Sequence, residues 1–245
     1  MLIVDSISNQ KSAITNSLAR VLLEVIVQTV ADARAAAEGG ADRLEVVRAI
    51  GDGGLTPPLS LVTAIAAEVP LPLRVMIREN SGFETASHEV RALQRAAAGL
   101  AGIGVDGLVA GFAQAGKVPL ADLSLVLDAA PGVPLTFHRA FDALSDPLGA
   151  IDILSRMPQV DGILTSGGAG TAAERCARLR SYSARAGVRL VIMAAVGVDE
   201  EAFALFAKAG CVRAIHLGRA ARDGRNPEGP VSAASVRRLR NMADA

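Results

Sequence analysis

Residues 22–47 read LLEVIVQTVADARAAAEGGADRLEVV, and this stretch contains one complete strand–helix–strand unit. The apolar, β-branched run at 22–27 predicts a buried strand, and the alanine-rich residues 29–38 predict a helix. The Gly39-Gly40 pair suits the left-handed turn that ends many helices, and a second strand is predicted at 43–47. Two short strands joined by a helix in this way indicate a parallel sheet.

The same unit recurs along the chain, with a new apolar run about every 20 to 35 residues. Eight such units close naturally into a (β/α)8 barrel of the TIM type, which commonly forms one domain. An open doubly wound sheet is the alternative, but no GxGxxG fingerprint follows the first strand. We therefore predict a single α/β barrel over 21–245, preceded by an N-terminal extension at 1–20. The remaining strands are predicted at 73–77, 107–112, 134–138, 162–166, 189–194 and 214–218.

Composition and charge argue against several classes of partner. The 245 residues carry 25 Lys plus Arg and 25 Asp plus Glu, with no Trp, one Tyr and six Phe. The positive charge and stacking residues typical of nucleic-acid binding are therefore missing. No apolar run reaches the roughly 18 to 20 residues of a membrane span, and the first residues lack a signal-peptide pattern. Cys176 and Cys211 form no metal-binding or disulfide spacing, which favours a cytoplasmic location.

Ionisable residues in the predicted strands mark a candidate site, because branched apolar side chains normally fill a barrel interior. Glu24 and Glu45 lie in the first two strands, and Arg74 and Arg78 lie in and just after the third. His216 lies in the last strand, where it could bind a ligand or simply complete the core. We expect acids and arginines of different units to meet at the carboxyl-terminal mouth. The alternative is that both glutamates form buried ion pairs with Arg74 or Arg78 that fix strand register.

A second group of candidates follows the fifth strand. His138, Arg139 and Asp142 supply a proton carrier, an anion clamp and an orienting carboxylate within five residues. A histidine buried in the core for structural reasons is the alternative interpretation of His138.

A glycine-rich turn begins at Thr165, Ser166 and Gly167, between the sixth strand and the helix that follows. Its free N–H groups could hold a phosphate or carboxylate at the positive end of that helix. Gly197, after the seventh strand, could complete this anion cradle, as equivalent loops do in many phosphate-binding barrels. An ordinary tight turn is the alternative, because the segment matches no P-loop pattern.

The chain contains the segments GGADRLE at 39–45, GGLTP at 53–57, VMIR at 75–78, TFHRAFD at 136–142 and ILTSG at 163–167. In this order, and over about residues 22–220, the chain resembles the CutC family. The resemblance implies a TIM-type barrel, self-association, a cytoplasmic location and a role in copper homeostasis. Family members often carry cysteine after the first- and second-strand glutamates, whereas this chain has Val25 and Val46. The thiolates that suit Cu(I) are therefore absent there.

The sequence leaves two main functions open, with a metal ion or a small anion as the expected partner. Copper binding in homeostasis is implied by the family alone, and the residues themselves assign no metal ligand or cofactor. The alternative is an enzyme with lyase- or isomerase-type chemistry on a small anionic or phosphorylated sugar-like metabolite. Arg78 and Arg139 would then bind the anion, Glu24 or Glu45 would act as general base, and His138 would transfer a proton. A non-catalytic interaction scaffold is a third class.

Overall fold

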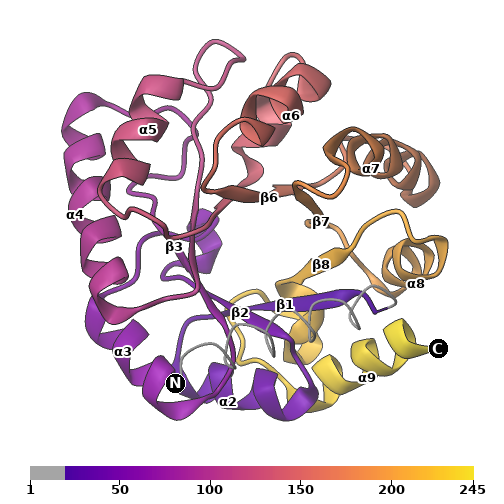
Figure 1. Ribbon diagram of the computed structural model, residues 1–245. Coiled ribbons are helices and arrows are strands. Elements are labelled where there is room, and N and C mark those ends of the chain that lie inside the picture. The colour runs from indigo at the N-terminus through magenta and orange to yellow at the C-terminus, as the bar shows by residue number, and fades with distance from the viewer. Residues whose placement is uncertain (1–19) are drawn as a thin grey trace, which may run out of the picture.

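The computed structural model describes residues 20–245, which form a closed barrel of eight parallel strands surrounded by helices (Figure 1). Neighbouring strands follow the order of the sequence, and β1 pairs with β8 to close the barrel. The predicted (β/α)8 barrel is confirmed. The strands are β1 (Leu22–Val27), β2 (Arg43–Val46), β3 (Leu73–Met76), β4 (Gly107–Ala110), β5 (Leu135–Phe137), β6 (Val160–Thr165), β7 (Val191–Ala194) and β8 (Ala214–Leu217).

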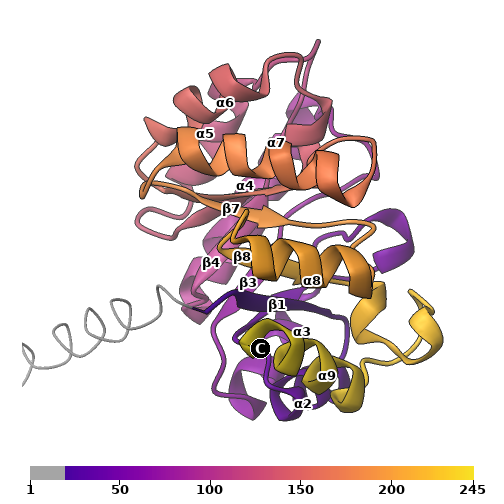
Figure 2. The same ribbon diagram turned by 90° about the vertical axis from the view of Figure 1, so that its right-hand side faces the viewer.

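Helices cover the outside of the barrel, and short 3-10 turns follow β2, β5 and β8 at its mouth. Figure 2 shows α8 and α9 lying along the outer side of the barrel, with the C-terminus at the end of α9. The helices are α2 (Val30–Gly39), α3 (Leu59–Glu68), α4 (Ser87–Ile103), α5 (Leu120–Asp128), α6 (Pro147–Ser155), α7 (Ala172–Ala186), α8 (Glu200–Ala209) and α9 (Ala233–Asp244). The 3-10 turns are η1 (Ile50–Asp52), η2 (Arg139–Ala143), η3 (Arg219–Ala221) and η4 (Asp223–Arg225).

Local capping explains where the first unit turns. The Thr29 hydroxyl accepts the Asp32 N–H at 3.0 Å and so begins α2. Gly40 ends that helix at a φ of 90°, in the left-handed region that the Gly39-Gly40 pair predicted. Of the N-terminal extension predicted at 1–20, only Arg20 lies within the described residues, and it pairs with Asp244 of α9 at 3.2 Å.

The alternation of strand side chains divides the apolar residues into an outer and an inner set. Leu23, Val25 and Val27 of β1 are fully buried in the large core between strands and helices. Glu24 and Ile26 consequently face the bore, because successive strand residues point to opposite sides. Among the described residues, no helix combines the length and apolar composition needed to cross a membrane.

Candidate functional site

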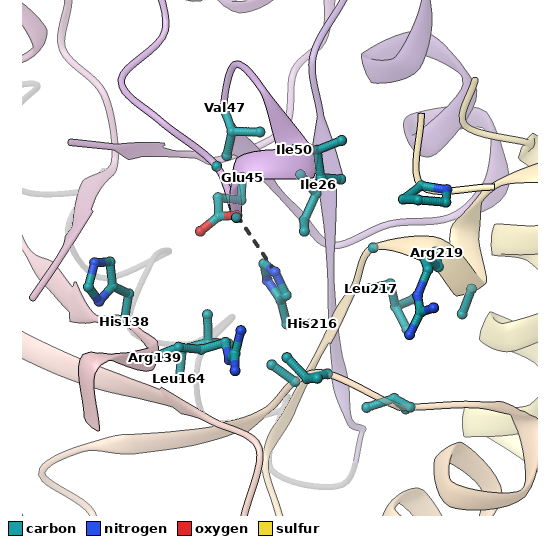
Figure 3. A pocket seen from close by; sticks show the side chains of 18 of the residues that line it. Ile26, Glu45, Val47, Ile50, His138, Arg139, Leu164, His216, Leu217 and Arg219 are labelled. Carbon is teal, nitrogen blue, oxygen red and sulfur yellow. Dashed lines mark ion pairs between the residues drawn. The ribbon is translucent and has the colours of Figure 1, made fainter. Parts of the chain in front are cut away.

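A cavity of about 550 Å³ lies at the carboxyl-terminal mouth of the barrel. Strand ends form its floor, and the loops after β2, β7 and β8 form much of its wall. Its volume is in the range of pockets that hold small metabolites. Figure 3 shows the Glu45–His216 pair near the middle of this space, with His138 and Arg139 on one side and Arg219 on the other.

Glu24 lies beneath the cavity in a buried network of charged groups. The strand register places it opposite Arg43 of β2 and His216 of β8. Its Oε2 accepts from Arg43 Nε at 2.6 Å, and its Oε1 lies 2.8 Å from His216 Nδ1. Burial alone would raise the pKa of Glu24, but Arg43 and His216 lower it to about 2. Glu24 is thus a permanent carboxylate, already fully engaged, and poorly suited to accept a proton from a substrate.

Glu45 is the carboxyl of this network that lines the cavity. Its Oε2 lies 3.6 Å from His216 Nε2, and its buried Oε1 has no hydrogen-bond partner among the described residues. Burial and the negative charge of Glu24 raise the pKa of Glu45 to about 7, against the opposing effect of His216. Burial lowers the pKa of His216, but the two glutamates outweigh it and raise the pKa above its ordinary value. A carboxyl with a pKa near 7 can both accept and donate a proton at neutral pH.

His138 lies across the cavity from this pair as a neutral imidazole. Its Nδ1 accepts the Ala140 N–H at 3.1 Å, which begins η2 and leaves Nε2 to carry the ring proton. Burial, followed by the positive charges of Arg78 and Arg139, lowers the pKa of His138 to about 3. His138 can therefore donate a hydrogen bond from Nε2, but it does not become positively charged near pH 7.

Arg78 and Arg139 give this side of the cavity a positive charge. The Arg78 guanidinium donates to the carbonyls of Gly53, Ser81 and Gly82 and contacts no carboxylate among the described residues. Burial and the nearby Arg139 lower its pKa. Within residues 20–245, Arg139 has one carboxylate at ion-pair distance, that of Asp142, with Nε 3.5 Å from Oδ2. Two arginines with so little compensating charge attract an anion to this wall.

Arg74 was predicted with the anion-binding residues, but the structure places it elsewhere. Its two terminal nitrogens lie 3.1 and 2.5 Å from the two oxygens of Asp161, near the start of β6. Because Arg74 precedes Met76 and Arg78 along β3, it lies at the opposite end of the bore from the mouth. It pairs with neither Glu24 nor Glu45, so the alternative in which the glutamates pair with Arg74 or Arg78 is wrong: Arg74 pairs with Asp161, and Glu24 pairs with Arg43.

Of the predicted anion cradle, Thr165, Ser166 and Gly167 form hydrogen bonds within the chain and do not line the cavity. Asp142, predicted to orient His138, accepts from the Thr165 hydroxyl at 2.5 Å and from the Ser166 N–H at 3.0 Å. The Gly167 N–H donates to the Thr165 hydroxyl at 3.1 Å. These groups have partners within the chain, which closes the β6–α7 turn. Gly197 does line the cavity, together with Glu45, Arg78, His138, Arg139 and His216.

Two functional candidates, Arg43 and Arg175, were missed from the sequence. Arg43 is two residues before Glu45 in β2, so strand alternation alone would have placed it on the same inward face. Arg175 lies in α7 but sends its guanidinium to the loop after β7, a contact for which the sequence holds no signal.

The fold and the cavity together define a class: (β/α)8 barrels with a pocket at the carboxyl ends of their strands. The model of the CutC family matches residues 21–221, and the chain belongs to this family. A CutC family protein of Caulobacter vibrioides is 38% identical over 199 residues, which cover 80% of both chains. One from Histophilus somni is 34% identical over 197 residues, covering 80% of this chain and 81% of the other.

Solved structures show the same fold. A Streptococcus agalactiae protein described as a candidate copper homeostasis protein CutC aligns with a TM-score of 0.74 and 24% identity, covering 80% of this chain and 97% of the other. Thiamine phosphate pyrophosphorylase from Pyrococcus furiosus aligns with a TM-score of 0.60 and 16% identity, covering 92% and 96% of the two chains. Both likenesses concern the barrel architecture.

The donor atoms near the cavity do not fit a Cu(I) site. Cu(I) favours thiolates and thioethers. Cys176 and Cys211 are buried in the core between strands and helices, and Met76 is the one thioether among the described residues that line the cavity. Glu24, Glu45 and His216 offer three ligand atoms within 4.8 Å of one another. However, the imidazole lies between the carboxylates, with one nitrogen toward each, and Arg43 already bonds Glu24. These residues fit a hydrogen-bonded charge network better than a thiolate-type copper centre.

Proposed function

We propose that this protein is an enzyme that uses acid–base chemistry of the lyase or isomerase type on a small anionic, phosphorylated or carboxylated metabolite. The observation that carries the proposal is Glu45: a buried carboxyl at a metabolite-sized cavity, with an unpartnered oxygen and a pKa near 7. Such a group is costly to keep in a barrel interior, and active sites are where such pKa shifts concentrate.

The proposed roles follow from the charges around the cavity. Glu45, as the carboxylate, takes a proton from a substrate C–H or O–H group and becomes the neutral acid, while the negative charge passes to the substrate. His216 faces Glu45 and stabilises its carboxylate form before the transfer. Arg78 and Arg139 bind the anionic group of the substrate, and the neutral His138 donates a hydrogen bond to a substrate oxygen. Glu24 and Arg43 do not touch the substrate in this proposal and hold His216 in place.

Proton exchange with solvent tests this function even when the reaction product is unidentified. A panel of phosphorylated sugars, hydroxy acids and keto acids is incubated with the protein in D2O, and loss of substrate C–H signals is followed by proton NMR. We expect at least one compound to exchange, and Glu45→Gln to slow that exchange by about 100-fold to 10,000-fold. The exposed Glu201→Gln is the matched control. Equal exchange rates in wild type and Glu45→Gln would show that Glu45 does not take the proton from the substrate.

Metal-ion binding is a second candidate, favoured by the three ligand atoms of Glu24, Glu45 and His216. Copper is included among the ions because one similar solved structure is described as a candidate copper homeostasis protein. Titration with Cu(I) under reducing conditions, and with Cu(II) and Zn²⁺, tests it. A site made by these residues predicts one ion per chain and loss of that binding in His216→Ala. Equal metal affinity in wild type and His216→Ala would rule out a metal site formed by these three residues.

We also propose a cytoplasmic site of action and self-association. The two free, buried cysteines support a reducing compartment. Analytical ultracentrifugation measures the subunit number directly.

A further inference from the structure

We propose that the cavity holds a second anion subsite, built from three backbone N–H groups after β7 and the side chain of Arg219. The class of substrate that follows, which rests on the proposed function, is a short carbon compound with an anionic group at each end. One of these groups is phosphate-like, because a trioxyanion can accept several N–H donors at once.

Arg175 determines the direction of the peptide groups in the β7–α8 loop. Its guanidinium donates to three successive carbonyls, those of Ala195 at 3.1 Å, Val196 at 2.6 Å and Gly197 at 3.0 Å. In a planar trans peptide the N–H points opposite to the carbonyl of the same unit. The N–H groups of Val196, Gly197 and Val198 therefore all point away from Arg175.

These three N–H groups lie at the cavity wall. Residues Val196, Gly197 and Val198 line the cavity, and no hydrogen bond within residues 20–245 engages their N–H groups. Val196 and Gly197 both have a φ of 58°. A β-branched residue rarely adopts this left-handed conformation, so the loop is held in a strained shape by its contacts with Arg175. Successive N–H groups turned to one side form a concave anion-binding surface.

Arg219 supplies a full positive charge next to this surface. It begins η3, directly after β8, and lines the same cavity. Within the described part of the chain its guanidinium makes no ion pair or hydrogen bond. The neighbouring acids are engaged elsewhere: Asp199 accepts the Ala202 N–H at 2.9 Å at the start of α8, and Glu200 pairs with arginines of η4 and α9. Arg219 is therefore available to a ligand.

The two anion-binding walls flank the acid–base pair. Figure 3 shows Arg139 and Arg219 on opposite sides of His216, which faces Glu45. A ligand that reaches both arginines therefore spans the space beside His216, the partner of Glu45. A cavity of about 550 Å³ accommodates a small metabolite of this kind. Two anchored ends would place the middle carbons of the substrate at Glu45, where the proposed proton transfer takes place.

Backbone NMR tests the subsite directly. The ¹⁵N-labelled full chain is titrated with inorganic phosphate, and the amide signals are followed. We expect the amide protons of Val196, Gly197 and Val198 to move downfield together on saturation, as expected for N–H groups that bond to an anion. In Arg219→Gln we expect the phosphate affinity of these signals to fall about tenfold or more, whereas the exposed Arg91→Gln leaves it unchanged. Unmoved amide signals at saturating phosphate, or equal affinities in the two variants, would overturn the proposal.

A series of linked bisphosphates tests the two-ended substrate. Bisphosphates of 1,3-propanediol, 1,4-butanediol and 1,5-pentanediol are compared with inorganic phosphate by calorimetry. We expect one length to bind at least about 100-fold more tightly than phosphate, because the second group binds intramolecularly. Arg219→Gln and Arg139→Gln should each remove that gain. Affinities that do not depend on linker length would overturn the proposal that one ligand binds both walls. An affinity gain that is unchanged in Arg219→Gln would overturn it as well. These measurements need no turnover, so they are independent of the proton-exchange test of Glu45.

Discussion

Glu24 and His216 face each other across the β1–β8 ladder that closes the barrel, with Oε1 of the glutamate 2.8 Å from Nδ1 of the histidine. The other carboxylate oxygen bonds to Arg43, and the other imidazole nitrogen faces Glu45. The buried Glu24 carboxylate thus connects the β1–β8 pairing to the His216 imidazole, which faces Glu45 at the cavity. The same network stabilises the fold and sets the pKa values on which the proposed chemistry depends. It can therefore be tested by unfolding experiments and by titration.

Replacing Glu24 by Gln should destabilise the fold. The change leaves Arg43 and His216 buried without the negative charge that compensates them, at a cost of about 3 kcal/mol. Urea unfolding at pH 7 measures this loss. The exposed Glu201→Gln should stay within about 0.5 kcal/mol of wild type. A loss below about 1 kcal/mol in Glu24→Gln would show that the network contributes little to stability.

Stability should fall as the pH rises from about 5 to 8. Glu45 has a folded-state pKa of about 7 against 4.5 for the ordinary group, so the folded chain binds more protons between these values and unfolding becomes easier as pH rises. His216 acts in the same direction, because its raised pKa contributes stability that is present below 6.5 and lost as pH rises through the folded-state value. Urea unfolding at several pH values measures the slope.

Glu45→Gln should flatten this decline between pH 5 and 7, because it removes the Glu45 titration and, with it, a negative charge that raises the pKa of His216. The gain at pH 8 should be up to about 3 kcal/mol relative to wild type. Glu24 acts with the opposite sign: its pKa of about 2 gives stability that is lost as pH falls below about 4.5. A wild-type slope that is unchanged in Glu45→Gln would contradict the raised pKa of Glu45.

The histidines should titrate very differently in proton NMR. With a pKa of about 3, the His138 ring should keep constant C–H shifts from pH 5 to pH 9. The His216 ring should titrate above the ordinary value of 6.5, because Glu45 and Glu24 favour its charged form. The variants His138→Gln and His216→Gln assign the signals. A His138 ring that titrates near pH 6 would show that burial and the charges of Arg78 and Arg139 do not lower its pKa.

Asp161→Asn should lower the stability of the fold without changing ligand binding at the mouth of the barrel. The change removes the partner of the buried Arg74 and should cost about 1 to 2 kcal/mol, less than a fully buried pair because the Asp161 side chain is 39% exposed. Phosphate affinity should be unchanged, since Arg74 is remote from the cavity. A loss of phosphate affinity in this variant, measured by calorimetry, would show that Arg74 contributes to anion binding.

The sequence by itself determined the architecture. Apolar runs such as 22–27 alternate with alanine-rich helices, and Gly39-Gly40 ends a helix where a left-handed turn is required. These are local signals, because a buried strand or a helix end is specified by neighbouring residues. They also identified most ionisable residues of the mouth, since Glu45 and Arg78 stand out within otherwise apolar segments.

Only the tertiary structure decided which of these residues meet. Strand alternation gives the face of Arg74 but not its partner Asp161, which is 87 positions away along the chain. Likewise, Asp142 bonds the β6–α7 turn and Arg175 reaches the loop after β7, because closing the barrel brings loops from different units together. Partner choice depends on distances between units and on competition for buried hydrogen bonds. Local sequence does not encode either quantity, whereas the closed sheet fixes both.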